Sequence, residues 1–408
     1  MSKQNSSGEW RDTQESLEKT MIDRRKFVKL GATAITAVFL AGWNLNDKRY
    51  AYATPGSGAL GAGNVLTIVH TNDVHSYVDV LPYVKGLVDS LNDDGKTVVL
   101  VSAGDDFAGT PFASMTAGQD VVVAMNMTEY DMFTIGNHEY LMNPSDFKAV
   151  VDKVSFPVLA CNVLPSIGNA SPSIADYELL DFVGTRIAFI GIAYDQPGAP
   201  DLLSSIQAAK QAAENEGATV FIGISHLGLN DPDESRRSTY VADNCPWFSA
   251  IVDGHSHTEL ATGEVRDNGV LVVQTGEYGN NIGVTELSID GTTVTGAVAC
   301  LIKIKGNEQT CGIAPDDKVQ EFIASVNAKN AYLNAVVFTL PAKFDGSRES
   351  VRTRETALGN MVADSMRLKT GTDIAFVSGA SLRIDLGPGD VTLGQLQTAL
   401  MAETELAR

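Results

Sequence analysis

The sequence predicts a layered α/β fold, with one large unit followed by part of a second. Short runs of apolar and β-branched residues recur along the chain, and they are apolar without interruption, as strands buried on both faces are. Longer mixed segments lie between the runs, and several are long enough for helices, as around residues 208–215. The runs that we expect to be strands are 65–71, 97–104, 132–136, 158–163, 186–192, 219–225, 250–254, 270–276 and 282–289.

A helix is expected to join the two units. Residues 316–326 place apolar side chains at intervals of three and four, which forms one face of a helix, and Asp316 is a natural N-cap. The chain therefore divides into a first domain at residues 64–312, a linker helix within 313–335 and a second unit at 336–408.

The second unit combines helix and strand signals. It contains a predicted helix at 356–369, a predicted strand at 373–379 and a Gly/Pro turn at 387–389. The chain ends soon after this turn, so we expect a truncated domain. An incomplete α/β domain of this kind exposes strand edges and half-covered apolar surface.

Residues 1–53 resemble a twin-arginine signal peptide. Arg24 and Arg25 precede an apolar run, and an A-x-A cleavage site follows at residues 51–53. An amphipathic N-terminal helix is the alternative interpretation. Residues 54–63 then form a flexible lead-in. The pattern predicts export to the periplasm, the cell envelope or the medium, after the chain has folded.

Composition excludes several classes of protein. Hydrophobic residues make up 44% of the chain, which is ordinary for a globular protein, and no stretch reaches the ~18 apolar residues of a membrane span. The net charge of −20 disfavours binding to nucleic acid through a basic face. None of the four cysteines lies in a C-x-x-C motif, and Cys300 and Cys311 flank a short loop where a disulfide is one of two alternatives.

The histidines mark a candidate site. Each of them lies at or just beyond the carboxyl end of a predicted strand, where ligands collect in α/β sheets. The six are His70, His75, His138, His226, His255 and His257.

The spacing of these residues favours a metal site. Asp73 and His75 are two positions apart, as are His255 and His257, and residues i and i+2 of an extended chain point the same way. Imidazole, carboxylate and amide ligands suit divalent metals such as zinc, manganese or iron. A single histidine is more often structural, and we interpret His70 in that way. Five strand ends, however, each offer Asp, Asn or His side chains, and together they indicate metal binding.

The motifs resemble a known family. The ordered segments DVH (73–75), GDD (104–106), GNHE (136–139), SHLG (225–228) and GHSH (254–257) are similar to the signature of calcineurin-like metallophosphoesterases. The stretches HTNDVH, ACNV and QTGEYGNNIG resemble the 5′-nucleotidase and UDP-sugar hydrolase branch. The resemblance implies a four-layer α/β/β/α sandwich followed by a partial 5′-nucleotidase C-terminal domain.

The resemblance also implies a site with two divalent metal ions, zinc, manganese or similar. The first would be held by Asp73, His75 and His257, and the second by Asn137, His226 and His255. Asp105 would bridge them, and a hydroxide held by the metals would attack phosphorus. His138 would stabilise charge on the phosphoryl oxygens and protonate the leaving oxygen.

One position departs from the family pattern. An aspartate commonly follows the His138 position by three residues and orients the imidazole, but this chain has Leu141 there. The sequence leaves two alternatives: another carboxylate, Asp131 or Glu139, orients the ring, or His138 is less well oriented.

The C-terminal segment carries a second resemblance. Arg348, Arg352 and Arg383 match the arginines that bind substrate in 5′-nucleotidases, and arginine forks suit phosphate groups. Surface solvation is the alternative interpretation of these charges. The first position of the aromatic clamp that stacks a nucleobase is Ala402 here, so we expect weak discrimination between bases.

The expected function is hydrolysis of a small phosphate ester. Nucleoside 5′-monophosphates are the first candidate substrates, and UDP-sugars and 2′,3′-cyclic nucleotides are further candidates. The alternatives are a metal- or ligand-binding envelope protein with little catalysis, and a hydrolase of a non-nucleotide ester on the same fold.

Overall fold

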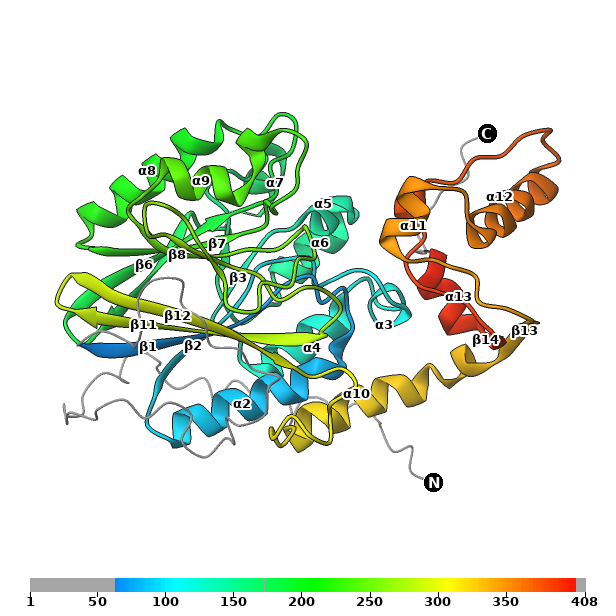
Figure 1. The fold of residues 1–408 in the computed structure, drawn as a ribbon, viewed down its shortest axis with the longest axis horizontal. Coiled ribbons are helices and arrows are strands. Elements are labelled where there is room, and N and C mark those ends of the chain that lie inside the picture. Colours follow the sequence, from blue (N-terminus) through cyan, green and yellow to red (C-terminus); the bar gives the residue numbers. More distant parts are fainter. Residues whose placement is uncertain (1–62, 172, 401–408) are drawn as a thin grey trace, which may run out of the picture.

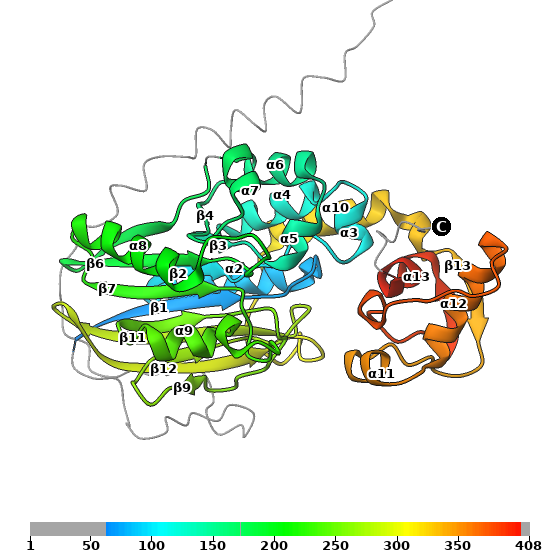
Figure 2. The ribbon, with the colours of Figure 1, turned by 90° about the horizontal axis from the view of Figure 1, so that it is seen from above.

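Two sheets stacked face to face form the centre of the molecule, and helices cover both outer faces (Figures 1 and 2). The computed structural model describes residues 63–171 and 173–400, so the predicted signal peptide and Ala402 lie outside the described residues. In spatial order, the first sheet consists of β12 (Thr293–Lys303), β11 (Asn281–Asp290), β1 (Asn64–Thr71), β2 (Thr97–Ser102), β3 (Met132–Thr134) and β4 (Val158–Leu159). The second consists of β5 (Tyr177–Phe182), β6 (Thr185–Ile192), β7 (Val220–Ser225), β8 (Phe248–Val252), β10 (Leu271–Val273) and β9 (Glu264–Val265).

The strands are apolar on both faces because each sheet is covered on both sides. Between the sheets lies a layer that includes Leu66, Val101, Phe189 and Ile222, all of them buried. The outer face of the first sheet packs against α2 (Leu81–Asp93), α4 (Gln119–Thr128) and α10 (Asp317–Lys329). The outer face of the second packs against α8 (Leu202–Asn215) and α9 (Ser238–Asn244). The predicted α/β/β/α order is confirmed.

The remaining helices of this part are short, and they lie in the connections between strands. They are α3 (Pro111–Ser114), α5 (Asn137–Leu141), α6 (Pro144–Val151), α7 (Pro165–Ala170) and the 3₁₀ turns η2 (Val78–Val80), η3 (Glu234–Arg236) and η4 (Ala331–Asn334). None of the helices in the described part of the chain is both long enough and apolar enough to cross a membrane.

The expected linker helix is α10. Asp316 caps it, since its Oδ1 accepts a hydrogen bond of 2.8 Å from the backbone N–H of Val319. Ile323 and Val326 are buried against α2 and α4. The helix therefore belongs to the outer layer of the large domain and leads from it to the second unit (Figure 1).

The second unit is a small α/β body with its own core. Strands β13 (Val336–Leu340) and β14 (Gly389–Thr392) pair antiparallel. Around them lie α11 (Arg348–Thr353), α12 (Ala357–Thr370), α13 (Leu393–Leu400) and the 3₁₀ turn η5 (Gly379–Ser381). Leu340, Leu358, Leu386 and Val391 form the buried core.

The predicted strand at 373–379 is wrong. The segment is irregular up to η5, and Ile374 and Phe376 are 67% and 85% exposed. A strand needs a neighbour to pair its backbone N–H and C=O groups, and β13 and β14 pair only with each other in the described residues. The β-branched and apolar composition of the segment is therefore not sufficient to make it a strand.

Strand predictions in the large domain also need correction. β4 ends at Leu159, short of the predicted 163, and beyond it the Asn162 side chain pairs with both backbone groups of Ala193, at 3.0 and 2.8 Å. The strands β5, β9 and β12 are not among the predicted strands, because they are edge strands with partly exposed faces and lack continuous apolar runs.

The structure also decides between the alternatives for the cysteines. Cys300 and Cys311 are both buried thiols and are not joined by a disulfide. Cys300 lies on β12, while Cys311 Sγ faces the backbone oxygens of Glu308 and Ile313 at 3.7 and 3.9 Å. The alternative of a disulfide across this loop is therefore dropped.

Candidate metal centre

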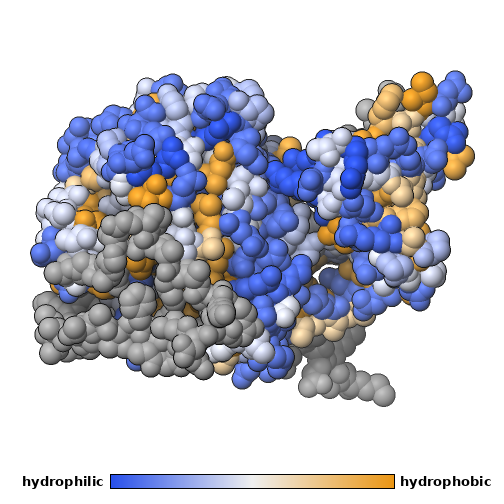
Figure 3. Space-filling model, in the orientation of Figure 1, coloured by the Kyte–Doolittle hydropathy of each residue, from blue (hydrophilic) through white to orange (hydrophobic). Residues whose placement is uncertain are grey.

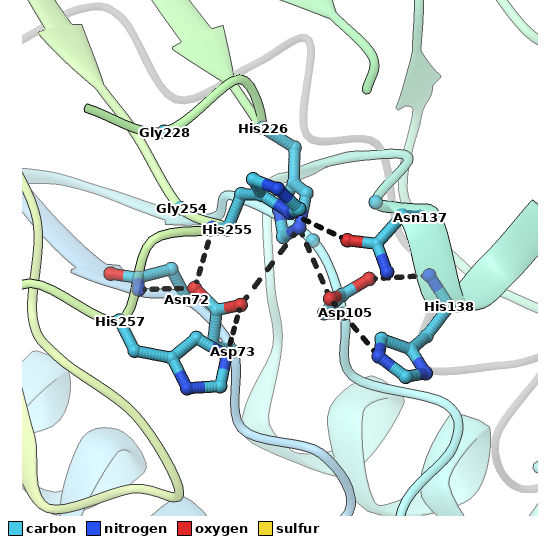
Figure 4. A network of polar contacts seen from close by, with 12 residues as sticks. Asn72, Asp73, Asp105, Asn137, His138, His226, Gly228, Gly254, His255 and His257 are labelled. Atoms are coloured by element: carbon cyan, nitrogen blue, oxygen red, sulfur yellow. Dashed lines mark hydrogen bonds and ion pairs between the residues drawn. The ribbon is translucent and has the colours of Figure 1, made fainter. Parts of the chain in front are cut away.

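The polar side chains predicted to converge do meet, at the carboxyl ends of the central strands of both sheets (Figure 4). Parallel strands end at the same edge of a sheet, and here those edges of the two stacked sheets lie together. Asp73 follows β1, Asp105 follows β2, Asn137 follows β3, His226 follows β7, and His255 and His257 follow β8.

One group consists of Asp73, His75 and His257. Asp73 Oδ1 lies 3.1 Å from His257 Nε2 and 3.8 Å from His75 Nε2, and the two imidazole nitrogens are 3.3 Å apart. All three ligand atoms fall within 4.8 Å of one another. Three atoms with lone pairs that face one point form a suitable cradle for a cation.

Asp105 lies between this group and the rest of the site. Its Oδ2 is 3.1 Å from His226 Nε2 and 3.8 Å from His75 Nε2, while its Oδ1 accepts a hydrogen bond of 2.8 Å from the backbone N–H of His138. One carboxylate oxygen of Asp105 thus faces histidines from both halves of the site.

The second group adds an amide. His255 Nδ1 lies 2.7 Å from Asn137 Oδ1, and the backbone N–H of His255 donates to Asp73 Oδ2 at 2.9 Å. His226 Nδ1 contacts the backbone oxygen of Ala103, so its Nε2 is turned toward Asp105. A second contact thus holds His226 and His255 in place.

The backbone is strained where these residues lie. Asp73, His75, Asp105, His255 and His257 all have positive φ, between 48° and 70°. This left-handed region is unfavourable for residues with a Cβ, and it persists only where the surroundings impose it, which is common at functional sites. At Gly136 no side chain would fit, because a Cβ would lie 2.1 Å from Asp105 Oδ1.

The electrostatics of the centre also suit a cation. Burial alone would raise the pKa of Asp73, but His257 and His226 outweigh it and lower that pKa. Burial lowers the pKa of His75 well below its ordinary value. Asp73 Oδ1 and His226 Nε2 are buried, and each faces a polar atom of the centre at 3.1 Å, His257 Nε2 and Asp105 Oδ2 respectively, without the geometry of a hydrogen bond. Burial would lower the pKa values of His226 and His257 as well, but the neighbouring carboxylates outweigh it and raise them to about 10 and about 9, so a bound cation would displace these protons. Carboxylate oxygens and imidazole nitrogens together form a donor set that fits divalent metals.

His70 does not join the centre. It is buried in β1 with its ring against Gly283, where a Cβ would come within 2.2 Å of the imidazole, and its Nε2 lies 3.4 Å from Thr285 Oγ1. Burial lowers the pKa of this imidazole to about 3, so it stays neutral. These contacts agree with the structural interpretation of His70.

Known proteins are similar to this chain in sequence and in fold. Residues 66–259 match the calcineurin-like phosphoesterase family, and residues 332–408 match the 5′-nucleotidase C-terminal domain. The chain thus combines a segment of the calcineurin-like phosphoesterase type with a segment of the 5′-nucleotidase C-terminal type. We call these two parts the phosphoesterase domain and the C-terminal domain below.

Two curated phosphoesterase relatives and one solved structure illustrate the similarity. The trifunctional nucleotide phosphoesterase YfkN of Bacillus subtilis is 28% identical over 81% of this chain. The matched region covers 26% of the length of YfkN. A 5′-nucleotidase of Vibrio vulnificus is 25% identical, with 82% of this chain and 71% of the relative covered. The crystal structure of a 5′-nucleotidase precursor from Thermus thermophilus superposes with a TM-score of 0.71 at 25% identity, over 82% of this chain and 73% of that one.

Glu139 of the phosphoesterase domain has a role that differs from the expected one. Its carboxylate accepts four backbone hydrogen bonds, from Gly136, Asp105, Asp106 and Phe107, at 2.8 to 3.2 Å. It thus ties the loop after β2 to the loop after β3, and none of these contacts is with the His138 ring. Its place in the GNHE segment was the only sequence signal for this role.

Neither proposed carboxylate orients His138. Asp131 Oδ2 accepts from the backbone N–H of Leu100 at 2.9 Å, and Glu139 is occupied as described. Within the described residues, His138 Nδ1 is buried without a hydrogen-bond partner. Leu141 is 62% exposed. The alternative in which Asp131 or Glu139 orients the ring is therefore dropped.

Two residues that support the first group were missed. Glu277 accepts a hydrogen bond from His257 Nδ1, which turns His257 Nε2 toward Asp73. Asn72 donates to Asp73 Oδ2 at 2.7 Å and accepts from the backbone N–H of Thr275 at 2.7 Å. Both lie in the quoted HTNDVH and QTGEYGNNIG stretches, but only the fold brings those stretches together.

Of the three arginines of the C-terminal domain, Arg383 contacts the centre. Arg383 Nη2 lies 3.0 Å from His138 Nε2. Burial lowers the pKa of Arg352, and the positive charges of Arg348 and Arg383 lower it further, so the three guanidinium groups lie close together. Figure 3 shows the surface hollowed between the two domains. The smaller domain thus presents a cationic group to the metal centre.

Proposed function

We propose that this chain is an exported, metal-dependent phosphoesterase that hydrolyses nucleoside 5′-monophosphates and related phosphate esters. The family consists of phosphoric ester hydrolases. The observation that carries the proposal is the buried set of carboxylate, amide and imidazole donors around Asp105, next to the arginines of the second domain. Metal ligands beside guanidinium groups suit a dianionic ester.

The donor set divides into two halves. Asp73, His75 and His257 would hold one divalent ion, and Asn137, His226 and His255 would hold the other. Asp105 would serve both, because its Oδ2 faces His75 as well as His226. When bound, two such ions supply positive charge to a phosphoryl group and lower the pKa of water, so that a nucleophile is available at neutral pH.

His138 lies at the rim of the centre. Its Nε2 is 4.0 Å from Asp105 Oδ2, and its ring meets the His75 ring edge-on with centroids 4.7 Å apart. From this position the imidazole can stabilise charge on a phosphoryl oxygen and give a proton to the leaving oxygen. Asp105 and His138 are thus the residues that we assign to catalysis.

The arginines define the substrate class. Arg348, Arg352 and Arg383 offer forked donors to anionic groups, which favours a phosphate ester over a neutral one. The printed names of the Bacillus and Vibrio relatives, a nucleotide phosphoesterase and a 5′-nucleotidase, support nucleotides as the substrate. UDP-sugars and 2′,3′-cyclic nucleotides carry the same charged group and complete the panel to be tested.

The test is hydrolysis by the purified chain with manganese and with zinc. We expect release of phosphate from p-nitrophenyl phosphate and from nucleoside monophosphates, loss of activity after EDTA, and recovery when metal is added. Ribose 5-phosphate serves as the substrate without a base. Metal binding without turnover of any ester would contradict the proposal and favour the ligand-binding alternative.

Export rests on the sequence of residues 1–53. Replacement of both Arg24 and Arg25 by lysine should hold the protein in the cytoplasm of the expressing cells, because twin-arginine transport depends on the arginine pair. Fractionation of cells that carry the wild-type chain or the doubly substituted chain measures this. An unchanged distribution between the fractions would contradict the proposed route.

A further inference from the structure

His138 is held without the contact that the family pattern leads one to expect. The imidazole is buried, yet within the described residues its Nδ1 has no hydrogen-bond partner. Leu141 stands at the position of the usual aspartate and has no group that could accept a hydrogen bond. A side chain that acts on a reacting group has to be held in place, so another contact must serve.

Three contacts hold the residue. Its backbone N–H donates to Asp105 Oδ1 at 2.8 Å, and its ring packs edge-on against His75 at an interplanar angle of 86°. The third contact comes from the C-terminal domain, where Arg383 Nη2 lies 3.0 Å from His138 Nε2. Among the residues that the structure describes, only Arg383 forms a hydrogen bond to the imidazole itself.

The chemistry of arginine decides the direction of this hydrogen bond. A guanidinium group stays protonated and has five N–H donors but no acceptor. At 3.0 Å, Arg383 must therefore donate, and His138 Nε2 must accept. The proton of the neutral imidazole is then on Nδ1. Arg383 thus determines both the direction of the ring and the nitrogen that carries the proton.

The guanidinium of Arg383 is itself anchored. It forms a hydrogen bond with the Tyr278 side chain. The Tyr278 ring packs against His75 with centroids 5.5 Å apart, and the backbone N–H of Tyr278 donates to Asp73 O at 2.8 Å. Arg383 thus contacts the phosphoesterase domain through two residues, His138 and Tyr278. These contacts fix its position as much as the C-terminal domain does.

We infer that Arg383 is the positioning residue of His138, in place of the carboxylate that is absent at Leu141. The inference rests on the proposed function, and it adds a role to the binding of substrate anions. The guanidinium has further N–H groups, so the same side chain can hold a phosphoryl oxygen beside His138 Nε2. The C-terminal domain then acts on turnover through His138 as well as on substrate binding.

The kinetic test is a double-mutant cycle on the manganese-loaded full chain. His138→Ala should lower kcat by roughly 10²–10⁴-fold, as for a positioned acid or base. Arg383→Ala should lower kcat about 10- to 100-fold, the usual effect of a charge-assisted hydrogen bond. In the His138→Ala background, Arg383→Ala should change kcat by less than about 2-fold. Equal losses in both backgrounds would overturn the inference, because Arg383 would then act independently of His138.

A spectroscopic test is independent of turnover. In the zinc-loaded, substrate-free chain labelled with ¹⁵N-histidine, the His138 signals, assigned by their loss in His138→Ala, should show an unprotonated Nε2 and a proton on Nδ1. Arg383→Ala should change this pattern. Arg354→Ala is the matched control, because Arg354 is exposed and pairs with Asp345 and Ser350 outside the centre, and it should change nothing. Identical His138 signals in wild type and Arg383→Ala would refute the inference, whereas a wild-type chain without phosphatase activity would refute only the proposed function.

Discussion

Five of the seven residues predicted as metal ligands have a left-handed backbone, and their neighbours account for it. The backbone N–H of Asp73 donates to Gly104 O at 2.9 Å, and that of His75 donates to Asp105 O at 2.8 Å. These bonds lock the loops after β1 and β2 to each other. The strain at single residues is thus offset by contacts between loops, so that the ligand atoms are aimed before any cation arrives.

A substitution of Asp105 tests whether the centre holds two metal ions. Asp105→Asn should remove nearly all turnover and reduce bound metal, because a neutral amide is a poor ligand for two cations. Elemental analysis of the purified variant, together with the phosphatase assay, measures both. Asp243→Asn is the control, since Asp243 pairs with Arg266 at the surface. Two metals and full activity in Asp105→Asn would exclude the dinuclear site.

Glu277 should affect the affinity for metal through its hydrogen bond with His257, without contacting the cation. Glu277→Gln weakens the acceptor that holds His257 Nδ1, and loss of such a partner typically costs about 10- to 100-fold in affinity. Competition with a zinc chelator measures the change. The surface substitution Glu308→Gln should leave the affinity unaltered. Equal affinities for the wild-type and Glu277→Gln chains would show that His257 is held by other contacts.

At the scale of elements, secondary structure follows local sequence where a local signal is complete. The helix α10 begins at its predicted cap, and α12 ends at Gly371 in a left-handed conformation, as C-terminal glycines commonly do. The segment 373–379 has strand composition but no neighbouring strand, and it stays irregular. Helices satisfy their own backbone groups, whereas a strand depends on a partner elsewhere in the chain.

The cap of α10 can be tested directly. Asp316→Ala removes the acceptor of the Val319 N–H and should lower the free energy of unfolding by about 1 kcal/mol, the usual value for an N-cap. Urea denaturation measures the difference. Asp316→Ser retains a capping oxygen and should recover most of the stability. Loss of equal size in both variants would mean that the cap is not the cause.

At the scale of the whole molecule, stability depends on the layer between the two sheets. Phe189 lies fully buried in this layer, whereas Phe376, in the irregular segment of the C-terminal domain, is 85% exposed. Both are phenylalanines in the same chain, so they separate the effect of burial from that of residue type.

Phe189→Ala should therefore lower the free energy of unfolding of the phosphoesterase domain by about 3–5 kcal/mol, as for a large side chain removed from a packed core. Phe376→Ala should change the free energy of unfolding of the C-terminal domain by less than about 0.5 kcal/mol, as for a surface position. Thermal unfolding followed by circular dichroism compares the two. A comparable loss for Phe376→Ala would show that its side chain is covered in solution.

The sequence by itself determined the α/β class, most of the central strands, the linker helix and the identity of the residues that meet at the centre. Buried strands and a capped helix have continuous local patterns, and short motifs such as D-x-H and H-x-H carry their ligands within a few residues. Only the tertiary structure decided what supports those ligands. Glu139 accepts from a loop 34 positions earlier, Glu277 meets His257 across a 20-residue separation, and Arg383 reaches His138 from 245 positions away. Such contacts depend on how the two sheets and the second domain pack, because distance in space, unlike residue type, is not written in any local stretch of the chain.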